Sequence, residues 1–242
     1  IKPMNPMFPG IQRNEAFCMD LARIIGIRVP NSKLIQMGPH ELYLVERFDR
    51  KILPERVARI HQEDFCQAMG LSHELKYQAE GGPGLKSCFD LVRTYSANPI
   101  KDFQQLMEWV FFNYLIGNMD GHAKNLSFIY QNGQIRLAPF YDMLCTDIYD
   151  NLSQKLAMKI GGENRPEWLM ERHWERFAKE IKVDYPVLKK RLLNFCLKVT
   201  GEIDTAYIDF TTRYQQNSLV EDIVAAIKKR SSKTLQQLNL IG

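Results

Sequence analysis

The sequence predicts an α+β fold that is mostly helical, and three observations support this prediction. In the first half of the 242 residues, short apolar runs typical of strands alternate with helical patterns. In the second half, apolar residues recur at helical spacing almost throughout. The dipeptide Asn132-Gly133, set between two apolar runs, is a strong β-hairpin signal. We therefore expect a largely helical unit that carries a short hairpin.

Helices in the first half are predicted from apolar residues that return to one face every three or four positions. A first helix is expected between Asn14, its predicted N-terminal cap, and Gly26, its predicted end. The strongest helical pattern runs from Asp102 to Gly117. Its apolar and aromatic residues fall on one stripe that we expect in the core: Phe103, Leu106, Met107, Val110, Phe111, Tyr114 and Leu115.

The remaining elements are predicted from the same two periodicities. The run Leu42–Val45 suits a strand that leads into a connector. Residues 126–130 and 134–138 are expected to be the two strands of the hairpin. From Trp168 onward the pattern predicts two helices, and a last helix is expected to start near Leu219. The hairpin is thus expected to follow the long apolar helix directly.

Composition and charge argue against several classes of protein. Hydrophobic residues make up 45% and charged residues 25% of the chain, as in an ordinary globular protein. The net charge of +4 is spread without a block of five like charges, so we expect no direct contact with nucleic acid. The longest apolar stretches, such as 109–117, are well short of the roughly 20 residues that cross a membrane, so no membrane partner is expected.

The cysteines indicate the compartment. They stand at positions 18, 66, 88, 145 and 196, and no two of them have a zinc-ligand spacing. An odd number of scattered cysteines indicates reduced, buried thiols. The N-terminus also lacks the charged and apolar regions of a secretion signal. We therefore expect a cytoplasmic protein, while delivery of the protein to another cell stays open.

A polar loop between the long apolar helix and the hairpin holds the candidate chemistry. It runs from Asn118 to Asn125 and contains Asp120, and loops on a rigid scaffold are where functional residues concentrate. If the Asn-Gly pair forms the turn, opposed hairpin positions sum to about 265. Asn125 and Asp142 are then offset by about two residues, or roughly 7 Å along the strands. The hairpin therefore predicts that these two side chains can share one cation.

The three side chains suit phosphoryl transfer that depends on magnesium. Magnesium takes one or two carboxylates, substrate phosphates and water, and Asn125 and Asp142 offer oxygen ligands of this kind. The transfer also needs a carboxylate that accepts the proton of an acceptor hydroxyl, a role that Asp120 suits. From the spacing alone a structural alternative stays open, in which Asp120 and Asn125 cap turns and Asp142 caps a following helix.

The order of these residues resembles the protein-kinase pattern, in which a catalytic Asp precedes a metal-binding Asn by five positions and a second metal-binding Asp follows a hairpin. A closer resemblance is to the HipA-like toxin kinases, and it covers about residues 1–200. Five motifs in order carry this resemblance: residues 45–50, 61–67, 76–84, 117–125 and 137–142. The resemblance implies a protein-kinase-like C-terminal lobe with the short β-hairpin at its active site.

This resemblance implies a role for each matching residue. Asp120 would be the catalytic base, and Asn125 and Asp142 would bind the metal. Lys2 would hold the α- and β-phosphates of ATP. Further residues expected to contact the nucleotide lie in the loop, after the hairpin and at the hinge between the lobes, where backbone groups would bind adenine: His122, Lys124, Tyr141, Glu46, Arg47 and Phe48. The segments 61–67 and 81–84 are expected to be a supporting helix and a supporting loop.

Two departures from common protein kinases accompany the resemblance. Asn118-Met119 replaces the usual His-Arg before the catalytic Asp, and Tyr141-Asp142-Met143 replaces Asp-Phe-Gly. Both departures fit the toxin branch, and they argue against regulation of the kind found in ordinary protein kinases.

The domain organisation follows from the same resemblance. We expect residues 1–45 to be the remnant of a small lobe together with the first helix, and 46–242 to be the helical kinase lobe. Only Ile1 precedes Lys2, so the glycine-rich loop that covers the phosphates in kinases is missing from the sequence. We expect that loop, with an autophosphorylated serine, in an upstream part that this sequence does not include.

The function implied by the resemblance is that of a serine/threonine protein kinase that uses ATP and Mg²⁺. The implied setting is a toxin–antitoxin module with a DNA-binding antitoxin, a protein substrate such as an aminoacyl-tRNA synthetase, and a separately encoded small N-terminal partner. Two alternatives stay open: a kinase of small molecules on the same fold, and a pseudokinase or binding module. The intact trio of Asp120, Asn125 and Asp142 argues against mere docking.

Overall fold

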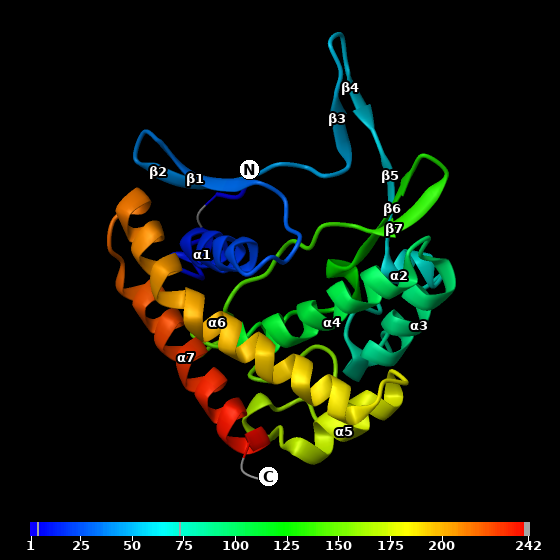
Figure 1. The fold of residues 1–242 in the computed structure, drawn as a ribbon. Helices are drawn as coiled ribbons and strands as arrows, with labels where there is room; N and C mark the ends of the chain where they lie inside the picture. The colour runs from blue at the N-terminus through cyan, green and yellow to red at the C-terminus, as the bar shows by residue number, and fades with distance from the viewer. Residues whose placement is uncertain (4, 73, 240–242) are drawn as a thin grey trace.

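The computed structural model describes residues 1–239 except residues 4 and 73. The strands gather along one side of the helices (Figure 1). The α-helices of the described residues are α1 (Ile11–Ile24), α2 (Phe65–Ala68), α3 (Leu85–Tyr95), α4 (Pro99–Ile116), α5 (Glu171–Glu180), α6 (Tyr185–Tyr214) and α7 (Ser218–Asn239). The strands are β1 (Ser32–Met37), β2 (His40–Val45), β3 (Arg50–Ile52), β4 (Val57–Arg59), β5 (His61–Asp64), β6 (Ser127–Gln131) and β7 (Gln134–Leu137). The predicted α+β fold, mostly helical, is confirmed.

The central helix α4 positions the loop that follows it. The Asn98 side chain accepts a hydrogen bond from the Lys101 N–H at 3.3 Å and caps the helix, and Pro99 stands in its first turn. Gly117 ends the helix with a φ of 72°, as the sequence predicted. The helix packs against α3, α6 and α7, so apolar side chains around most of its circumference are buried. The polar loop therefore leaves the core from a rigid base.

The first helix differs from its prediction. It begins at Ile11, after Gly10, so the prediction that Asn14 caps it was wrong. Asn14 lies inside α1 and is fully buried, and its amide pairs with both backbone groups of Cys145 at 2.7 and 2.8 Å. The helix ends near the predicted position, since Gly26 follows it with a φ of 81°. The contact with Cys145, which the sequence pattern did not indicate, explains why a polar residue is buried inside this helix.

The hairpin has the predicted register. Asn132 and Gly133 both have positive φ, at 52° and 71°, as a type I′ turn requires. Gln131 pairs with Gln134 and Phe128 with Leu137. Strand β5 pairs with the other edge of β6 and completes a three-stranded sheet. The segment 61–67 is thus a strand followed by the short α2, and the expectation of a helix throughout was wrong.

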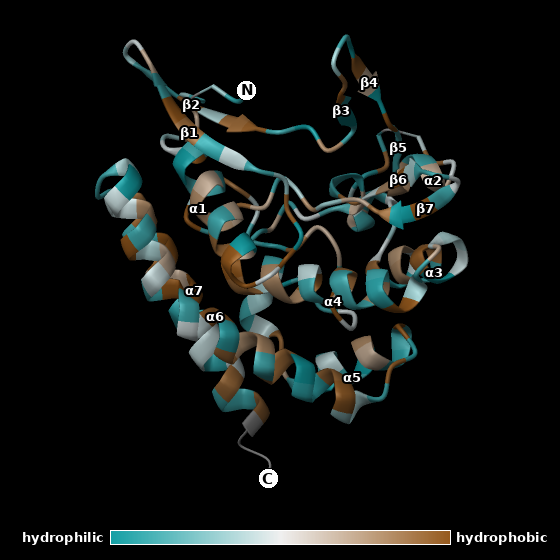
Figure 2. Cartoon of the chain, turned by 45° about the horizontal axis from the view of Figure 1, so that its top comes forward, coloured by the Kyte–Doolittle hydropathy of each residue, from teal (hydrophilic) through white to brown (hydrophobic). Residues whose placement is uncertain are grey.

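The other strands form two separate hairpins. The β1–β2 hairpin lies over α1, and Lys2 forms a β-bridge with Tyr43 at its edge. The β3–β4 hairpin projects away from the helices (Figure 1). Both hydrophobic and hydrophilic residues alternate along α6 and α7, as expected for helices with one buried face (Figure 2).

Two further expectations concern the core and the membrane. All five cysteines are buried and free of disulfides, as predicted. Among residues 1–239, apart from the two that are left out, no helix is both long enough and apolar enough to cross a membrane.

Candidate phosphotransfer site

The loop after α4 is fastened to the segment that follows the hairpin. The Gly117 carbonyl accepts hydrogen bonds from the backbone N–H groups of Thr146 and Asp147, each at 3.1 Å. The Met119 N–H donates to the Thr146 hydroxyl at 2.7 Å. A Cβ at position 117 would come within 2.8 Å of side-chain atoms of Arg230 and Asp147, so glycine is required for both its conformation and its size. The loop and the segment therefore form one structural unit.

Asp120 lies at the exposed turn of this loop. Its backbone N–H donates to the Asn118 side chain at 3.1 Å, and Asn118 in turn donates to Asn113 of α4 at 2.6 Å. The Asp120 side chain is 49% exposed. A base must be reachable by its substrate, and this exposure meets that requirement. The buried asparagines hold the loop while the carboxylate faces solvent.

Asn125 and Asp142 meet as the hairpin geometry predicted. Asn125 Nδ2 donates to Asp142 Oδ2 at 3.0 Å. The Asn125 oxygen accepts the His122 N–H at 2.9 Å and keeps one lone pair, because an amide oxygen carries two. Asp142 has a φ of 60°, a left-handed conformation that is uncommon for residues other than glycine and is concentrated at functional sites. The surrounding contacts thus hold Asp142 in an unfavourable conformation.

Lys2 joins the same carboxylate from the opposite end of the sequence. Its Nζ lies 2.7 Å from Asp142 Oδ1 and 2.8 Å from both oxygens of Glu15 on α1. Burial by itself would lower the pKa of Lys2, but the charges of Glu15 and Asp142 outweigh it and raise this pKa. The ammonium is therefore a firmly charged cation in the position beside Asp142 where a bound metal ion would be expected.

Glu15 is a site residue that the sequence prediction missed. It is buried, and this burial raises the pKa of its carboxyl to about 7, partly offset by Lys2. An available signal was the Lys–Glu ion pair that protein kinases form between a strand and the following helix. Glu15, as an acidic residue among the apolar residues of the first helix, fits that pattern.

The loop residues His122 and Lys124 lie around this centre. His122 Nε2 is 4.0 Å from Asp120 Oδ1, and its buried Nδ1 has no hydrogen-bond partner among the described residues. Burial lowers the pKa of His122, against the opposing effect of Asp120, and favours the neutral imidazole. The Lys124 backbone carbonyl accepts the hydroxyl of Tyr141 at 2.9 Å. This bond ties Tyr141, the residue directly before Asp142, to the loop.

The predicted hinge residues differ in their relation to the site. The Phe48 ring lies 5.7 Å from the Tyr141 ring, which brings the hinge beside the candidate metal residues. The Glu46 N–H already donates to the Asn31 carbonyl at 2.8 Å. The Arg47 guanidinium donates to both oxygens of Asp49, at 2.8 and 2.7 Å, so its side chain is held locally. Of the three side chains, that of Phe48 is the one these contacts place against the site.

The donor set fits magnesium that arrives with a nucleotide. Magnesium prefers oxygen ligands, and Asp142 offers its carboxylate while Asn125 offers the remaining lone pair of the amide oxygen that accepts the His122 N–H. The Lys2 ammonium lies on Asp142 Oδ1 where a metal ion would bind. Among the described residues, no group of three or more His, Cys, Asp or Glu side chains could hold a metal ion. A metal at this site would therefore complete its ligand shell with phosphate oxygens and water.

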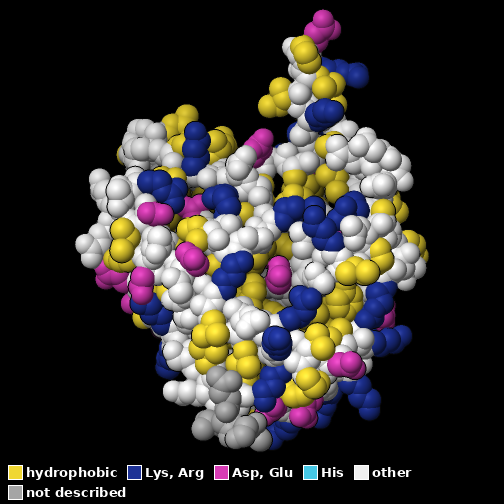
Figure 3. Space-filling view, viewed as in Figure 1, with side chains coloured by type: hydrophobic (Ala, Val, Ile, Leu, Met, Phe, Trp, Pro, Cys, Tyr) yellow, Lys and Arg dark blue, Asp and Glu magenta, His cyan; other side chains and the backbone are white. Residues whose placement is uncertain are grey.

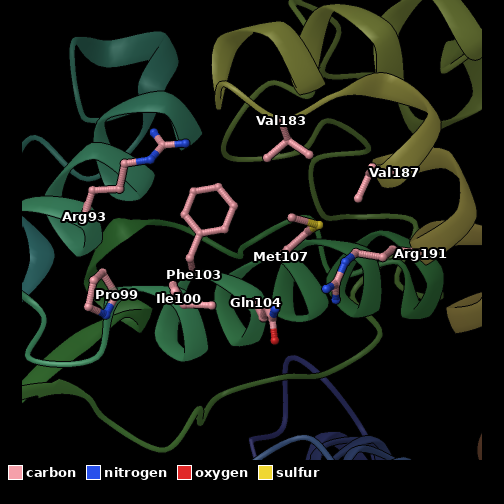
Figure 4. Close-up of a pocket in the computed structure, with 9 residues that line it drawn as sticks. All are labelled: Arg93, Pro99, Ile100, Phe103, Gln104, Met107, Val183, Val187 and Arg191. Atoms are coloured by element: carbon pink, nitrogen blue, oxygen red, sulfur yellow. The ribbon is translucent and has the colours of Figure 1, made fainter.

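The surface has two further features. Lys and Arg side chains gather below the base of the β3–β4 hairpin on the face shown in Figure 3. An open apolar hollow of about 290 Å³ lies between α3, α4 and α6, with Phe103 and Met107 in it and Arg93 and Arg191 at its sides (Figure 4). None of the residues that line this hollow is a predicted site residue. This hollow is therefore separate from the candidate site.

Comparison with known proteins agrees with this geometry. The HipA-like C-terminal domain family matches residues 1–207. The Sinorhizobium fredii protein Y4mE is 37% identical over 232 residues, which are 96% of this chain and 55% of that protein. The serine/threonine-protein kinase toxin HipA of Shewanella oneidensis is 36% identical over 165 residues, 63% of this chain and 38% of the toxin. The chain thus spans about half the length, or less, of these relatives.

Solved structures show the same fold. HipA of Shewanella oneidensis MR-1, solved with HipB and its operator DNA, superposes with a TM-score of 0.83 at 26% identity, over 96% of this chain and 57% of that one. The Helicobacter pylori proinflammatory kinase CtkA has a TM-score of 0.59 at 13% identity, over 95% and 84% of the two chains, and shares the fold alone. The predicted kinase-like fold is confirmed, and the chain belongs to the family of the HipA-like C-terminal domain.

Proposed function

We propose that this chain is the catalytic part of a serine/threonine protein kinase of the HipA toxin type that uses ATP and Mg²⁺. The observation that carries the proposal is the convergence of Lys2 and Asn125 on Asp142, at 2.7 and 3.0 Å, beside the exposed carboxylate of Asp120. Phosphoryl transfer needs this set of parts: a phosphate-binding lysine, metal ligands and a carboxylate for the acceptor.

Each binding residue has a part in holding the nucleotide. Asn125 and Asp142 would hold magnesium, which would supply positive charge that offsets the negative charge of the phosphates. Lys2, oriented by Glu15, binds the α- and β-phosphates, and His122 and Lys124 line the phosphate side of the loop. The hinge residues 46–48 and the Tyr141 ring lie on the adenine side, consistent with the contact between Phe48 and Tyr141.

Asp120 acts on the acceptor. It orients a serine or threonine hydroxyl and accepts its proton as the acceptor oxygen bonds to the γ-phosphorus. The bond from that phosphorus to the leaving oxygen of ADP breaks in the same transfer. Positioning and charge neutralisation supply most of the acceleration, because the reaction requires little covalent chemistry from the protein. The loop that holds Asp120 supplies that positioning, because hydrogen bonds to the side chains of Asn118 and Thr146 fix its backbone.

The biological setting is proposed from the relatives. One relative is by name a kinase toxin, and the solved HipA structure contains HipB and operator DNA. We propose a toxin–antitoxin module in the cytoplasm, with an antitoxin and a separate small N-terminal partner. An aminoacyl-tRNA synthetase is the proposed class of substrate. The division into a small-lobe remnant at 1–45 and a kinase lobe at 46–242 is part of the same proposal.

A phosphorylation assay in bacterial lysate tests the function. The full-length protein, together with its N-terminal partner, is supplied with Mg²⁺ and ATP labelled on its γ-phosphate. Wild type is compared with Asp120→Asn, Asp142→Asn and the control Asp150→Asn in an exposed loop. We expect a labelled protein on serine or threonine, with the rate reduced by about 10²-fold or more in the first two variants and unchanged in the control.

The other outcomes distinguish the alternatives. Label in a metabolite and in no protein would identify a small-molecule kinase and would refute the protein-kinase proposal. Equal labelling by wild type, Asp120→Asn and Asp142→Asn, or no labelling at all, would leave a docking function for the fold.

A further inference from the structure

Tyr77 contacts the candidate base directly, although neither the sequence prediction nor the proposed transfer gives it a role. Its hydroxyl donates to Asp120 Oδ1 at 2.7 Å, from a position 43 residues earlier in the chain. The residue belongs to the motif of Lys76-Tyr77 and a glycine-rich stretch, which the sequence predicted to be only a supporting loop. The contact is short and involves a carboxylate, so it belongs to the stronger class of hydrogen bonds.

The glycine-rich turn fixes the backbone of Tyr77. The Tyr77 carbonyl accepts hydrogen bonds from the Glu80 N–H at 3.0 Å and the Gly82 N–H at 2.9 Å. A Cβ on Gly82 would lie 2.8 Å from the carbonyl oxygens of both Leu75 and Tyr77, which is closer than the non-bonded contacts that Cβ atoms make in proteins. The turn therefore requires glycine at position 82 in order to hold Tyr77 where it is.

The Tyr77 ring is also held on its faces. The ring meets the His122 imidazole edge to face, with centroids 5.5 Å apart. The Lys76 ammonium lies 4.6 Å from the centroid of the same ring. Burial and the bond to Asp120 both raise the pKa of the Tyr77 hydroxyl. Tyr77 therefore remains protonated near neutral pH and acts as a donor toward Asp120.

This bond restricts Asp120 without blocking it. An ionised carboxylate has about four lone-pair positions on its two oxygens, so one donor on Oδ1 leaves room for an acceptor hydroxyl. Besides Tyr77, the exposed Asp120 carboxylate has His122 Nε2 at 4.0 Å, and the Asp120 backbone N–H donates to the Asn118 side chain. The Tyr77 hydroxyl thus favours one orientation of the Asp120 carboxylate relative to the residues that are proposed to bind the nucleotide.

We propose that Tyr77 is the positioning residue of Asp120, and that the glycine-rich turn at 81–84 exists to place its hydroxyl. The inference rests on the proposed phosphotransfer function. Misplacing a catalytic group by about 1 Å can cost about 10²-fold in rate. Loss of the hydroxyl is therefore expected to lower kcat and to leave nucleotide binding unchanged.

The test compares Tyr77→Phe with a matched control. Tyr207→Phe also removes a hydroxyl that donates to a carboxylate, that of Glu221 at 2.9 Å, on the surface between α6 and α7. Tyr77→Phe is expected to lower kcat by about 10- to 100-fold with KM for ATP within about twofold of wild type. Tyr207→Phe is expected to match wild type. Gly82→Ala, which displaces the turn, is expected to give the same loss of kcat as Tyr77→Phe.

A double variant separates positioning from a general structural role. If Tyr77 acts through Asp120, then Tyr77→Phe lowers the residual rate of Asp120→Asn by less than about twofold. An equal loss in both backgrounds would overturn the inference. A higher kcat with a lower KM for the acceptor would also overturn it, because Tyr77 would then be competing with the acceptor for Asp120.

The two proposals fail in different ways. If Asp120→Asn abolishes transfer and Tyr77→Phe matches wild type, the positioning role is wrong and the kinase function stands. If wild type and Asp120→Asn label proteins equally, the proposed function itself is wrong.

Discussion

Lys2 and Asp142, 140 residues apart, form an ion pair with Nζ and Oδ1 separated by 2.7 Å. The same ammonium binds both oxygens of the buried Glu15. One cation thus connects the edge of the β1–β2 hairpin, helix α1 and the segment after the β6–β7 hairpin. In the proposed kinase, this connection orders the phosphate side of the site before a nucleotide binds.

Replacement of Lys2 by methionine should weaken nucleotide binding selectively. A charge-assisted hydrogen bond contributes about 1.5–3 kcal/mol, so we expect KM for ATP to rise by about 10- to 100-fold. Lys51→Met, at an exposed position of β3, is the matched control and should leave KM unchanged. Steady-state kinetics with varied ATP make the comparison. An unaltered KM in Lys2→Met would show that Lys2 has no part in phosphate binding.

Glu15 should make stability depend on pH near neutrality. Burial raises the pKa of its carboxyl from 4.5 to about 7, so between these values the folded protein holds a proton that the unfolded chain releases. Stability therefore falls as pH rises through this window and levels off above pH 7. Glu15→Gln is neutral throughout and should remove this fall, so its stability relative to wild type should rise between about pH 5 and pH 7.

Urea unfolding of wild type and Glu15→Gln at pH values from about 5 to about 8 measures this difference. Parallel pH profiles for the two proteins would contradict the raised pKa.

Asp102 should stabilise the link between α4 and the hairpin. It is fully buried and accepts hydrogen bonds from Nε and Nη2 of Arg136, the Ser96 hydroxyl and the Leu137 N–H. Burial by itself would raise the pKa of Asp102, but these donors outweigh it and keep this pKa below its usual value. Its contribution is therefore complete above the usual pKa of an aspartate and is lost as pH falls through the lowered value.

Asp102→Asn is expected to lose about 3 kcal/mol of unfolding free energy at neutral pH, since it leaves Arg136 without its buried partner. Asp204→Asn, at the exposed ion pair with Lys228, should lose less than about 1 kcal/mol. Denaturant unfolding of the three proteins checks both values. Equal stabilities of the two variants would argue against the buried pair.

The buried contact between Asn14 and Cys145 should affect both stability and kcat. Its amide satisfies both backbone groups of Cys145, and Asn14→Ala would leave them buried without partners. We expect a loss of about 2 kcal/mol in stability and a lower kcat, because residues 143–145 follow Asp142 directly. Asn151→Ala, at an exposed position, is the control. Normal kcat in a correctly folded Asn14→Ala protein would show that this segment does not need the contact.

The local elements of the fold were predictable because their signals are local. The turn at Asn132-Gly133 depends on two residues that tolerate positive φ, and Gly117 ends α4 for the same reason. The contact between Asn125 and Asp142 followed from the register of that turn. In these places, chain geometry over fewer than about twenty residues decided the outcome.

Contacts between distant segments were not predictable in this way. Asn14 has the propensity of a helix cap, but its tertiary pairing with Cys145 placed it inside α1. Tyr77 stands in a loop with no periodicity, so nothing local indicated that it reaches Asp120. Strand β5 forms because β6 offers an edge to it, which the sequence of residues 61–64 did not indicate alone.

In the proposed kinase, Asp142 holds a divalent ion together with the nucleotide. Calorimetric titration with a non-hydrolysable ATP analogue, with and without Mg²⁺, measures this binding. In wild type and in Asp150→Asn, Mg²⁺ should strengthen binding by about tenfold or more, and in Asp142→Asn this gain should vanish. If Asp142→Asn retains the full gain from Mg²⁺, the metal is held elsewhere and the proposed role of Asp142 is wrong.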